Sequence, residues 1–174
     1  MSIGILFQVL PADLEKRVKT ALQALRDGIL TDIQVISFFF KYFFERLEPM
    51  YRNNPIAANA IQESVKNQEI GLVVHRLVDV TMYINTLSDL KFENGVALKI
   101  PSLVFDKLQV IEDILLAHTT LTQILVDKKV KVKKLATILR WLAPITTIQT
   151  EEILEKVRDE DLALLDKNLK KIGF

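Results

Sequence analysis

Apolar side chains recur along most of this chain at every third or fourth position, the spacing typical of amphipathic helices. The clearest case is residues 29–47, ILTDIQVISFFFKYFFERL, where apolar side chains occupy almost the whole circumference of the predicted helix. A helix on a protein surface needs only one apolar stripe, so this aromatic helix must be enclosed by other helices or by a partner. We therefore expect Phe40, in its middle, to be buried.

Helix boundaries follow from residues that favour helix ends. Pro11 suits a first turn, Gly28 suits a C-terminus, and Thr31 or Asp32 can cap the aromatic helix. Periodicity and such end signals predict further helices over residues 11–28, 55–66, 69–90, 102–126 and 127–144, and two short ones that start at Thr150 and Asp159.

One clear β signal lies between two of these helices. Asn94-Gly95 is typical of a two-residue type I′ turn, and the flanking segments 90–92 and 96–100 partly alternate in polarity. The alternatives there are a short β-hairpin and an irregular loop with a glycine bend.

Together these elements predict an all-α fold, a compact multi-helix bundle of about seven to eight helices, with or without the hairpin near Asn94-Gly95. At 174 residues the chain is long enough for one domain with a substantial core. We predict a single helical domain over residues 1–174, with residues 150–174 as an alternative C-terminal helical appendage.

Composition narrows the class of protein. Hydrophobic residues make up 49% of the chain and charged residues 26%, with a mean hydropathy of +0.21, so an apolar surplus must be buried or used in an interface. Charges interrupt the aromatic helix, and the apolar N-terminus is short and lacks a basic start, so neither a membrane span nor a signal peptide is predicted. The absence of cysteine excludes thiol chemistry and fits a reducing compartment, so we expect a cytoplasmic protein.

Two apolar segments are candidates for a protein interface. In the aromatic helix the candidates are Phe39, Tyr42 and Phe43, because aromatic side chains contribute strongly to interfaces. In the uncharged N-terminal run MSIGILFQVL they are Leu6 and Phe7, in a segment that could cover the bundle or insert into a neighbouring subunit. The alternative for the aromatic helix is a wholly internal position.

Basic residues concentrate between residues 128 and 149, where six positive charges occur without an acid. Lysines at the start of a helix oppose its macrodipole, so helix stability does not explain them. The candidate anion-binding residues of this basic cluster are Lys128, Lys129, Lys131, Lys133, Lys134 and Arg140. The cluster suits nucleic-acid phosphates, an acidic partner or an anionic membrane, and the alternative is a solvated face without a ligand.

The sequence lacks the motifs of common catalytic and cofactor sites, with no GxSxG, no glycine-rich phosphate loop and no HExxH. Its two histidines, His75 and His118, lack the further ligands that a metal needs, although His75 could pair with Asp79 at i+4 of a helix. We therefore expect no catalytic residue, metal or cofactor, and an enzyme built around either histidine is the least favoured hypothesis.

These features favour a non-enzymatic, helical protein–protein interaction module, such as an adaptor, assembly factor or structural subunit, that uses an apolar or aromatic surface. Its partner would be another protein or a second copy of this chain. The alternative is a nucleic-acid-associated protein that binds phosphates through residues 128–140.

Overall fold

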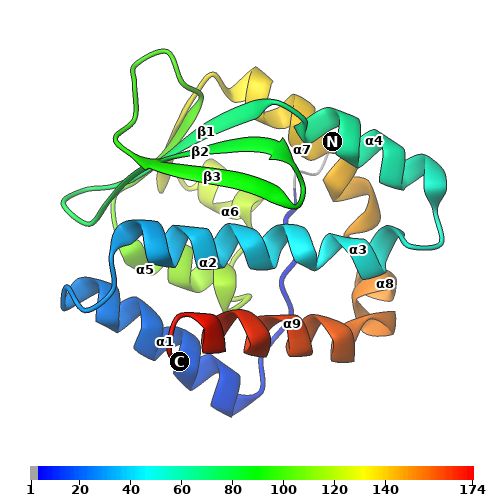
Figure 1. Ribbon diagram of the computed structural model, residues 1–174, viewed down its shortest axis with the longest axis horizontal. Coiled ribbons are helices and arrows are strands. Elements are labelled where there is room, and N and C mark those ends of the chain that lie inside the picture. Colours follow the sequence, from blue (N-terminus) through cyan, green and yellow to red (C-terminus); the bar gives the residue numbers. More distant parts are fainter. Residues whose placement is uncertain (1–3) are drawn as a thin grey trace.

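The structure is a computed structural model, and it describes residues 4–174. It is an α/β fold in which 54% of the residues are helical and 18% lie in the strands of a five-stranded mixed sheet (Figure 1). The all-α prediction is therefore wrong, and so is the prediction of a pure helix bundle. Residues 12–65 and 135–171 form only helices, whereas all five strands and two further helices lie between these ranges.

The elements follow one another along the chain as helices, then strands, then a mixture of the two. The helices are α1 (Ala12–Arg26), α2 (Asp32–Glu45), α3 (Leu47–Tyr51), α4 (Pro55–Val65), α5 (Leu108–Leu115), α6 (Leu121–Val126), α7 (Leu135–Ile148), α8 (Glu151–Lys156) and α9 (Arg158–Lys171). The strands are β1 (Gln68–Val74), β2 (Val78–Thr86), β3 (Asp89–Asn94), β4 (Ser102–Phe105) and β5 (Val130–Lys133).

The strand order in the sheet is β3-β2-β1-β4-β5. The first three strands form an antiparallel meander, in which Leu72 lies opposite Val80 and Met82 lies opposite Phe92. β4 then runs parallel to β1, and β5 returns antiparallel to β4. Residues 95–101 therefore form a crossover loop, which carries the chain from β3 at one edge to the far side of β1.

The inner face of the sheet is apolar and packs on α2. Along β2, the buried side chains of Val80, Met82 and Ile84 alternate with Asp79, which is exposed, and Tyr83, which is half-buried. Successive side chains of a strand point to opposite faces, so this alternation places the apolar set on one side. The contacts of α2 with β2 and β3 show that this is the side of the aromatic helix.

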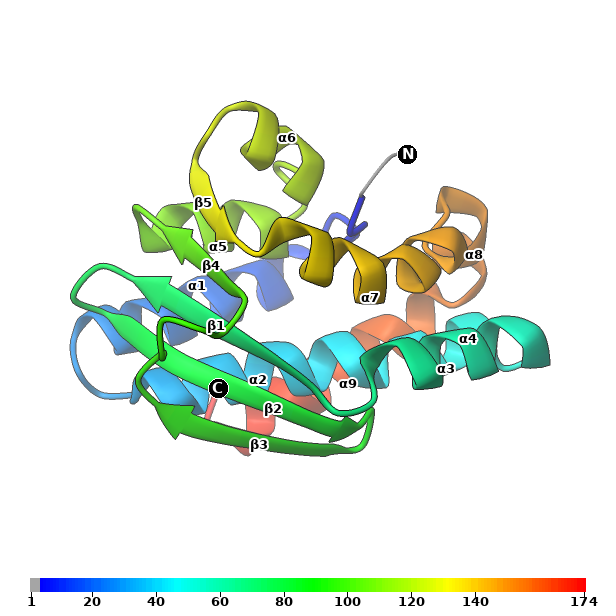
Figure 2. The same cartoon turned by 90° about the horizontal axis from the view of Figure 1, so that it is seen from above.

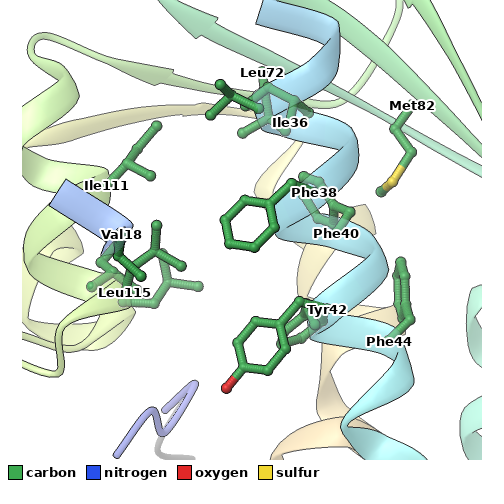
Figure 3. Close-up of a cluster of buried hydrophobic side chains, with 14 of the residues drawn as sticks. Val18, Ile36, Phe38, Phe40, Tyr42, Phe44, Leu72, Met82, Ile111 and Leu115 are labelled. Atoms are coloured by element: carbon green, nitrogen blue, oxygen red, sulfur yellow. The ribbon is translucent and has the colours of Figure 1, made fainter. Parts of the chain in front are cut away.

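The aromatic helix α2 is enclosed over most of its circumference, as its apolar positions predict, and only a narrow stripe that includes Lys41 is exposed. Phe38 points towards Val18 of α1, while Phe44 lies on the side of Met82 of β2 (Figure 3). Phe40 is buried, which confirms the prediction for the middle of this helix. The sheet thus covers a face for which the sequence analysis expected further helices.

Two helices from opposite ends of the chain, α1 and α9, form the layer on the far side of α2 from the sheet (Figure 1). α9 contributes Asp161, Leu165 and Leu169 to the interior. The helices of residues 150–174 therefore pack into the main body. At the other end of α2, α4 packs against α7, beyond the sheet (Figure 2).

The helix predicted over residues 69–90 is wrong, because this range forms β1, β2 and the turn between them. Its apolar residues fit a helical spacing as well as alternation, so periodicity alone was ambiguous. The content of β-branched residues distinguishes the two, since Val73, Val74, Val78, Val80 and Thr81 favour strands.

Of the two alternatives at Asn94-Gly95, the irregular loop with a glycine bend is the one that forms. β3 pairs with β2, and Gly95 (φ +89°) begins the crossover loop, so no type I′ hairpin forms there. Two further predictions around the sheet are wrong. The range 102–126 is divided into β4, α5 and α6 instead of one helix. The range 127–144 begins with β5, and α7 continues through Pro144. In each case a short alternating strand lies within a window that also has a helical spacing.

The remaining predicted helices are confirmed as α1, α2, α4 and the pair α8 and α9. Thr31 caps α2 as predicted, because its hydroxyl accepts a hydrogen bond from the Gln34 amide at 3.2 Å and the Gln34 side chain accepts one from the Thr31 amide. Thr150 caps α8 in the same manner through the Ile153 amide. Within residues 4–174, no helix has the length and apolar character needed to cross a membrane.

The crossover loop covers part of the outer face of the sheet at Gly71. The amide of Gly71 donates to the Pro101 carbonyl at 2.8 Å, and the Thr81 hydroxyl donates to the Gly95 carbonyl at 2.5 Å. A Cβ atom on Gly71 would lie 2.9 Å from Cγ2 of Val96 and closer still to Cγ1. Residue 71 must therefore be glycine for Val96 to pack against β1.

We predict that Gly71→Ala destabilises the fold by about 1–3 kcal/mol, because the added methyl group overpacks the contact with Val96. The double variant Gly71→Ala/Val96→Ala removes the obstructing side chain and should recover part of the loss. Urea unfolding followed by circular dichroism measures both. A double variant less stable than Gly71→Ala would contradict this explanation.

Candidate functional site

The N-terminal segment (residues 4–10) lies along α2 without forming a helix or strand. The ring of Phe7 has its centroid 6.1 Å from that of Phe39, 6.3 Å from that of Tyr42 and 6.5 Å from that of Phe43. The segment therefore packs its apolar side chains on the aromatic helix. Residues 1–3 of the predicted N-terminal contact lie outside the described residues.

A buried ion pair between α2 and α9 holds this segment in place. Arg46 Nη2 lies 2.7 Å from Asp161 Oδ2, Arg46 Nε donates to Oδ1 at 2.9 Å, and both side chains are fully buried. Tyr42 donates its hydroxyl proton to Oδ1 at 2.8 Å, and the Gln8 side chain donates to Oδ2 at 2.7 Å. The remaining nitrogen, Arg46 Nη1, donates to the Leu6 carbonyl at 2.7 Å.

Every charged atom of this pair has hydrogen-bond partners, which is the condition for burying charges at tolerable cost. Burial raises the pKa of the Tyr42 phenol, with Asp161 adding to the effect, so Tyr42 stays a neutral donor. Burial alone lowers the pKa of the Arg46 guanidinium, but Tyr42 and Asp161 outweigh it and the pKa is raised. The guanidinium also lies 4.7 Å from the centre of the Phe7 ring, a cation–π distance.

Beside the N-terminal segment lies an apolar cavity of about 50 Å³, between α2, the inner face of the sheet and α5 to α7. Every side chain that lines it is aliphatic or aromatic. The lining residues are Ile5, Ile36, Phe39, Phe40, Phe43, Ile70, Leu72, Leu103, Phe105, Ile111, Ile114, Leu121, Ile138, Trp141 and Leu142. Ile5 is the contribution of the N-terminal segment, which forms part of the wall of the cavity.

Trp141 in this lining has an unusual environment. Its side chain is 3% exposed, and its indole N–H has no hydrogen-bond partner among the described residues. Most buried donors in proteins are paired, and leaving one unpaired costs about 1–3 kcal/mol. Trp141 is also the only tryptophan in the sequence, so its fluorescence reports on this cavity alone.

A larger groove of about 1250 Å³ lies between α2, α3, α4, α9 and the turn from β2 to β3. Its lining contains five basic and five acidic residues. Arg52 pairs with Glu48 at 2.6 Å and with Glu160 at 2.9 Å, while Lys167 pairs with Glu45 at 3.4 Å. Since its charges balance, this groove has no net charge to attract a charged ligand, and we take the apolar cavity as the candidate site.

The predicted interface residues all lie in or beside this region. Tyr42 and Phe43 are buried, and Phe39, Leu6 and Phe7 are partly buried. The structure thus brings the two predicted apolar segments together, with the N-terminal segment lying on the aromatic helix. In the described structure, their apolar surface faces other parts of the same chain.

The basic cluster lies at the edge of the sheet that β5 forms. Lys128 and Lys129 precede β5, while Lys131 and Lys133 alternate along it with apolar residues, so their side chains face outwards. Of the two other members, Lys134 directly precedes α7 and Arg140 lies on it. All six side chains are exposed, and Lys129 forms an ion pair with Asp127 at 3.8 Å. Lysines on an edge strand also discourage pairing with another sheet.

The histidines do not meet in one site. His75 lies in the turn between β1 and β2, so its predicted helical pairing with Asp79 does not occur. His118 Nδ1 lies 3.7 Å from Asp113 Oδ1 at the surface. In the part of the chain that the structure describes, no group of three histidine, aspartate or glutamate residues is placed to hold a metal.

Arg46 and Asp161 are not among the candidate residues predicted from the sequence. One signal was present for Arg46, which follows Tyr42 by four positions and Phe43 by three and so lies on an apolar helix face. A charge on a buried face requires a partner, but the partner is 115 positions away and no local pattern identifies it.

Comparison of the chain with family models, curated proteins and solved structures finds no match.

We predict that Asp161→Asn destabilises the protein by about 3–5 kcal/mol, because it leaves the buried Arg46 without a counter-charge. The neighbouring Glu160→Gln makes the same chemical change at an exposed ion pair and should hardly move the unfolding midpoint. Thermal unfolding of both variants measures the difference. Equal losses of stability would show that the buried pair has no special role.

Proposed function

We propose that this chain binds an apolar small molecule or a hydrocarbon chain in the cavity beneath the sheet. The observation that supports this most is the lining, in which every side chain is aliphatic or aromatic. Small-molecule sites are concave and mostly apolar, and water gains little from occupying a space without polar partners. The lining offers no nucleophile and no acid–base pair, so binding is proposed without catalysis.

The size of the cavity sets a condition on the ligand. An apolar cavity of roughly 150 Å³ is known to hold benzene, so about 50 Å³ accommodates only part of such a molecule. A ligand must therefore displace a wall. The N-terminal segment is the wall most easily displaced, because it forms no helix or strand and contributes Ile5, which is itself only partly buried. Leu6 and Gln8 are held by Arg46 and Asp161, so we propose that the part before Leu6, with Ile5, moves when the ligand enters.

A protein-interaction module remains our second proposal. Its support is a set of strongly exposed apolar side chains, which are Val9, Ile29, Ile56, Leu98 and Val126. They lie on separate elements, however, and isolated exposed apolar residues are common on protein surfaces. The cytoplasmic location is likewise a proposal, supported by the lack of cysteine.

The ligand proposal predicts that 1-bromohexane quenches the fluorescence of Trp141 in a saturable manner, because bromine quenches an indole that it contacts. The same titration should raise the unfolding temperature, since a ligand that binds only the folded state stabilises it. Steady-state fluorescence and thermal unfolding on the same samples measure both effects. Linear, unsaturable quenching without a shift in the unfolding temperature would contradict the proposal.

Two matched variants localise the binding. Leu103→Phe fills the cavity from β4 and should weaken bromohexane binding at least tenfold. Leu90→Phe makes the same change at a partly buried position of β3 that does not line the cavity, and it should bind normally. If Leu90→Phe weakens binding as much as Leu103→Phe, the binding site is elsewhere.

A further inference from the structure

The surface where the crossover loop meets the start of α7 combines exposed leucines with lysines. We call it the lysine corner and define it by Leu98, Lys99, Lys131, Lys133, Lys134 and Leu135. Leu98 is the most exposed large apolar residue in the described chain, at 90%, and Leu135 is 41% exposed. Such residues are otherwise scattered singly, so their position among lysines is distinctive.

Contacts in the structure hold the parts of this corner together. Lys134 Nζ donates a hydrogen bond to the Lys99 carbonyl, which joins the crossover loop to the start of α7. Leu98 directly precedes Lys99, and Leu135 directly follows Lys134, so the two leucines flank this contact. On the adjoining strands, Lys133 lies opposite Ser102, three residues after Lys99.

The charge of the corner has one sign. The segments 95–105 and 128–140 contain seven lysines and arginines in total and no aspartate or glutamate. β5 is the edge strand, with its lysines facing outwards, so no further strand covers them. Anionic surfaces attract such an array, and each lysine near an anionic bilayer adds roughly fivefold to partitioning.

We propose that the lysine corner docks on the surface of an anionic phospholipid bilayer, with Leu98 entering the headgroup region. The lysines supply the electrostatic attraction and the leucines supply apolar area, which together are the two requirements for interfacial binding. A nucleic acid fits less well, because single-strand binding uses exposed aromatic side chains, whereas the nearby aromatic residues Phe105 and Trp141 are buried. The proposal does not depend on a ligand in the cavity.

The test measures co-sedimentation of the full chain with vesicles of phosphatidylcholine and with vesicles that also contain phosphatidylserine. We expect binding only to the second kind, and weaker binding at high salt. Lys131→Gln/Lys133→Gln should lower the partition coefficient about thirtyfold. The matched control Lys16→Gln/Lys66→Gln removes two exposed lysines elsewhere and should change it less than twofold.

A second matched pair tests insertion. Leu98→Ser should weaken binding to the anionic vesicles several-fold, whereas Ile56→Ser, an equally drastic change at a residue of α4 that is 84% exposed, should not. Circular dichroism establishes that all four variants are folded. If the two lysine double variants lose vesicle binding to the same extent, the proposal is overturned. A lack of binding to the anionic vesicles at low salt would overturn it as well. Binding to duplex DNA in a gel-shift assay, without binding to anionic vesicles, would assign the corner to nucleic acid instead.

Discussion

The buried ion pair between Arg46 and Asp161 links three parts of the chain that are well separated in sequence. Arg46 ends the aromatic helix α2, Asp161 lies in the first turn of α9, and both side chains hydrogen-bond to the N-terminal segment through Leu6 and Gln8. Because neither charge reaches water, the pair tolerates little displacement of any of these elements. The layer of α1 and α9, the aromatic helix and the N-terminal segment therefore depend on one geometry.

This geometry explains how an apolar cavity can persist beside an aromatic helix. The N-terminal segment is fixed at its polar end by Arg46 and Asp161, while Ile5, nearer the N-terminus, reaches the cavity wall. The aromatic side chains of α2 leave a gap against β1 and β4. β4 contributes Leu103 and Phe105 to that gap, and β5 beside it carries the outward lysines of the lysine corner. Cavity and corner are thus on opposite faces of the same edge of the sheet.

The sequence was sufficient for the parts of the fold that local signals determine. Helices α1, α2 and α4 have long apolar stripes and clear end signals, such as the Thr31–Gln34 capping box. The strands were missed because their apolar residues also recur at helical spacing, and the alternation of valine and lysine along β5 was interpreted as a charge cluster before a helix. The β-branched residues of β1 and β2 were the signal that could have corrected this.

The candidate site could not be predicted from patterns along the sequence, and the reason is a different one. Its lining comes from the N-terminal segment, α2, β1, β4, α5, α6 and α7, and no spacing along the chain relates these pieces. The enclosed aromatic helix was predicted, but whether its neighbours would fill the space around Phe39 depends on side-chain shapes in the folded state. The pairing of Arg46 with Asp161 could not be predicted either, because only the fold brings the two residues together.

The most direct test of the proposed site is a crystal structure of the full chain grown with 1-bromohexane, in which anomalous scattering locates the bromine. We expect one bromine position among Phe39, Leu103 and Trp141, with Ile5 displaced from its place in the wall. Bromine found only on the outer surface, with Ile5 and the cavity unchanged, would contradict the claim that this cavity is a binding site.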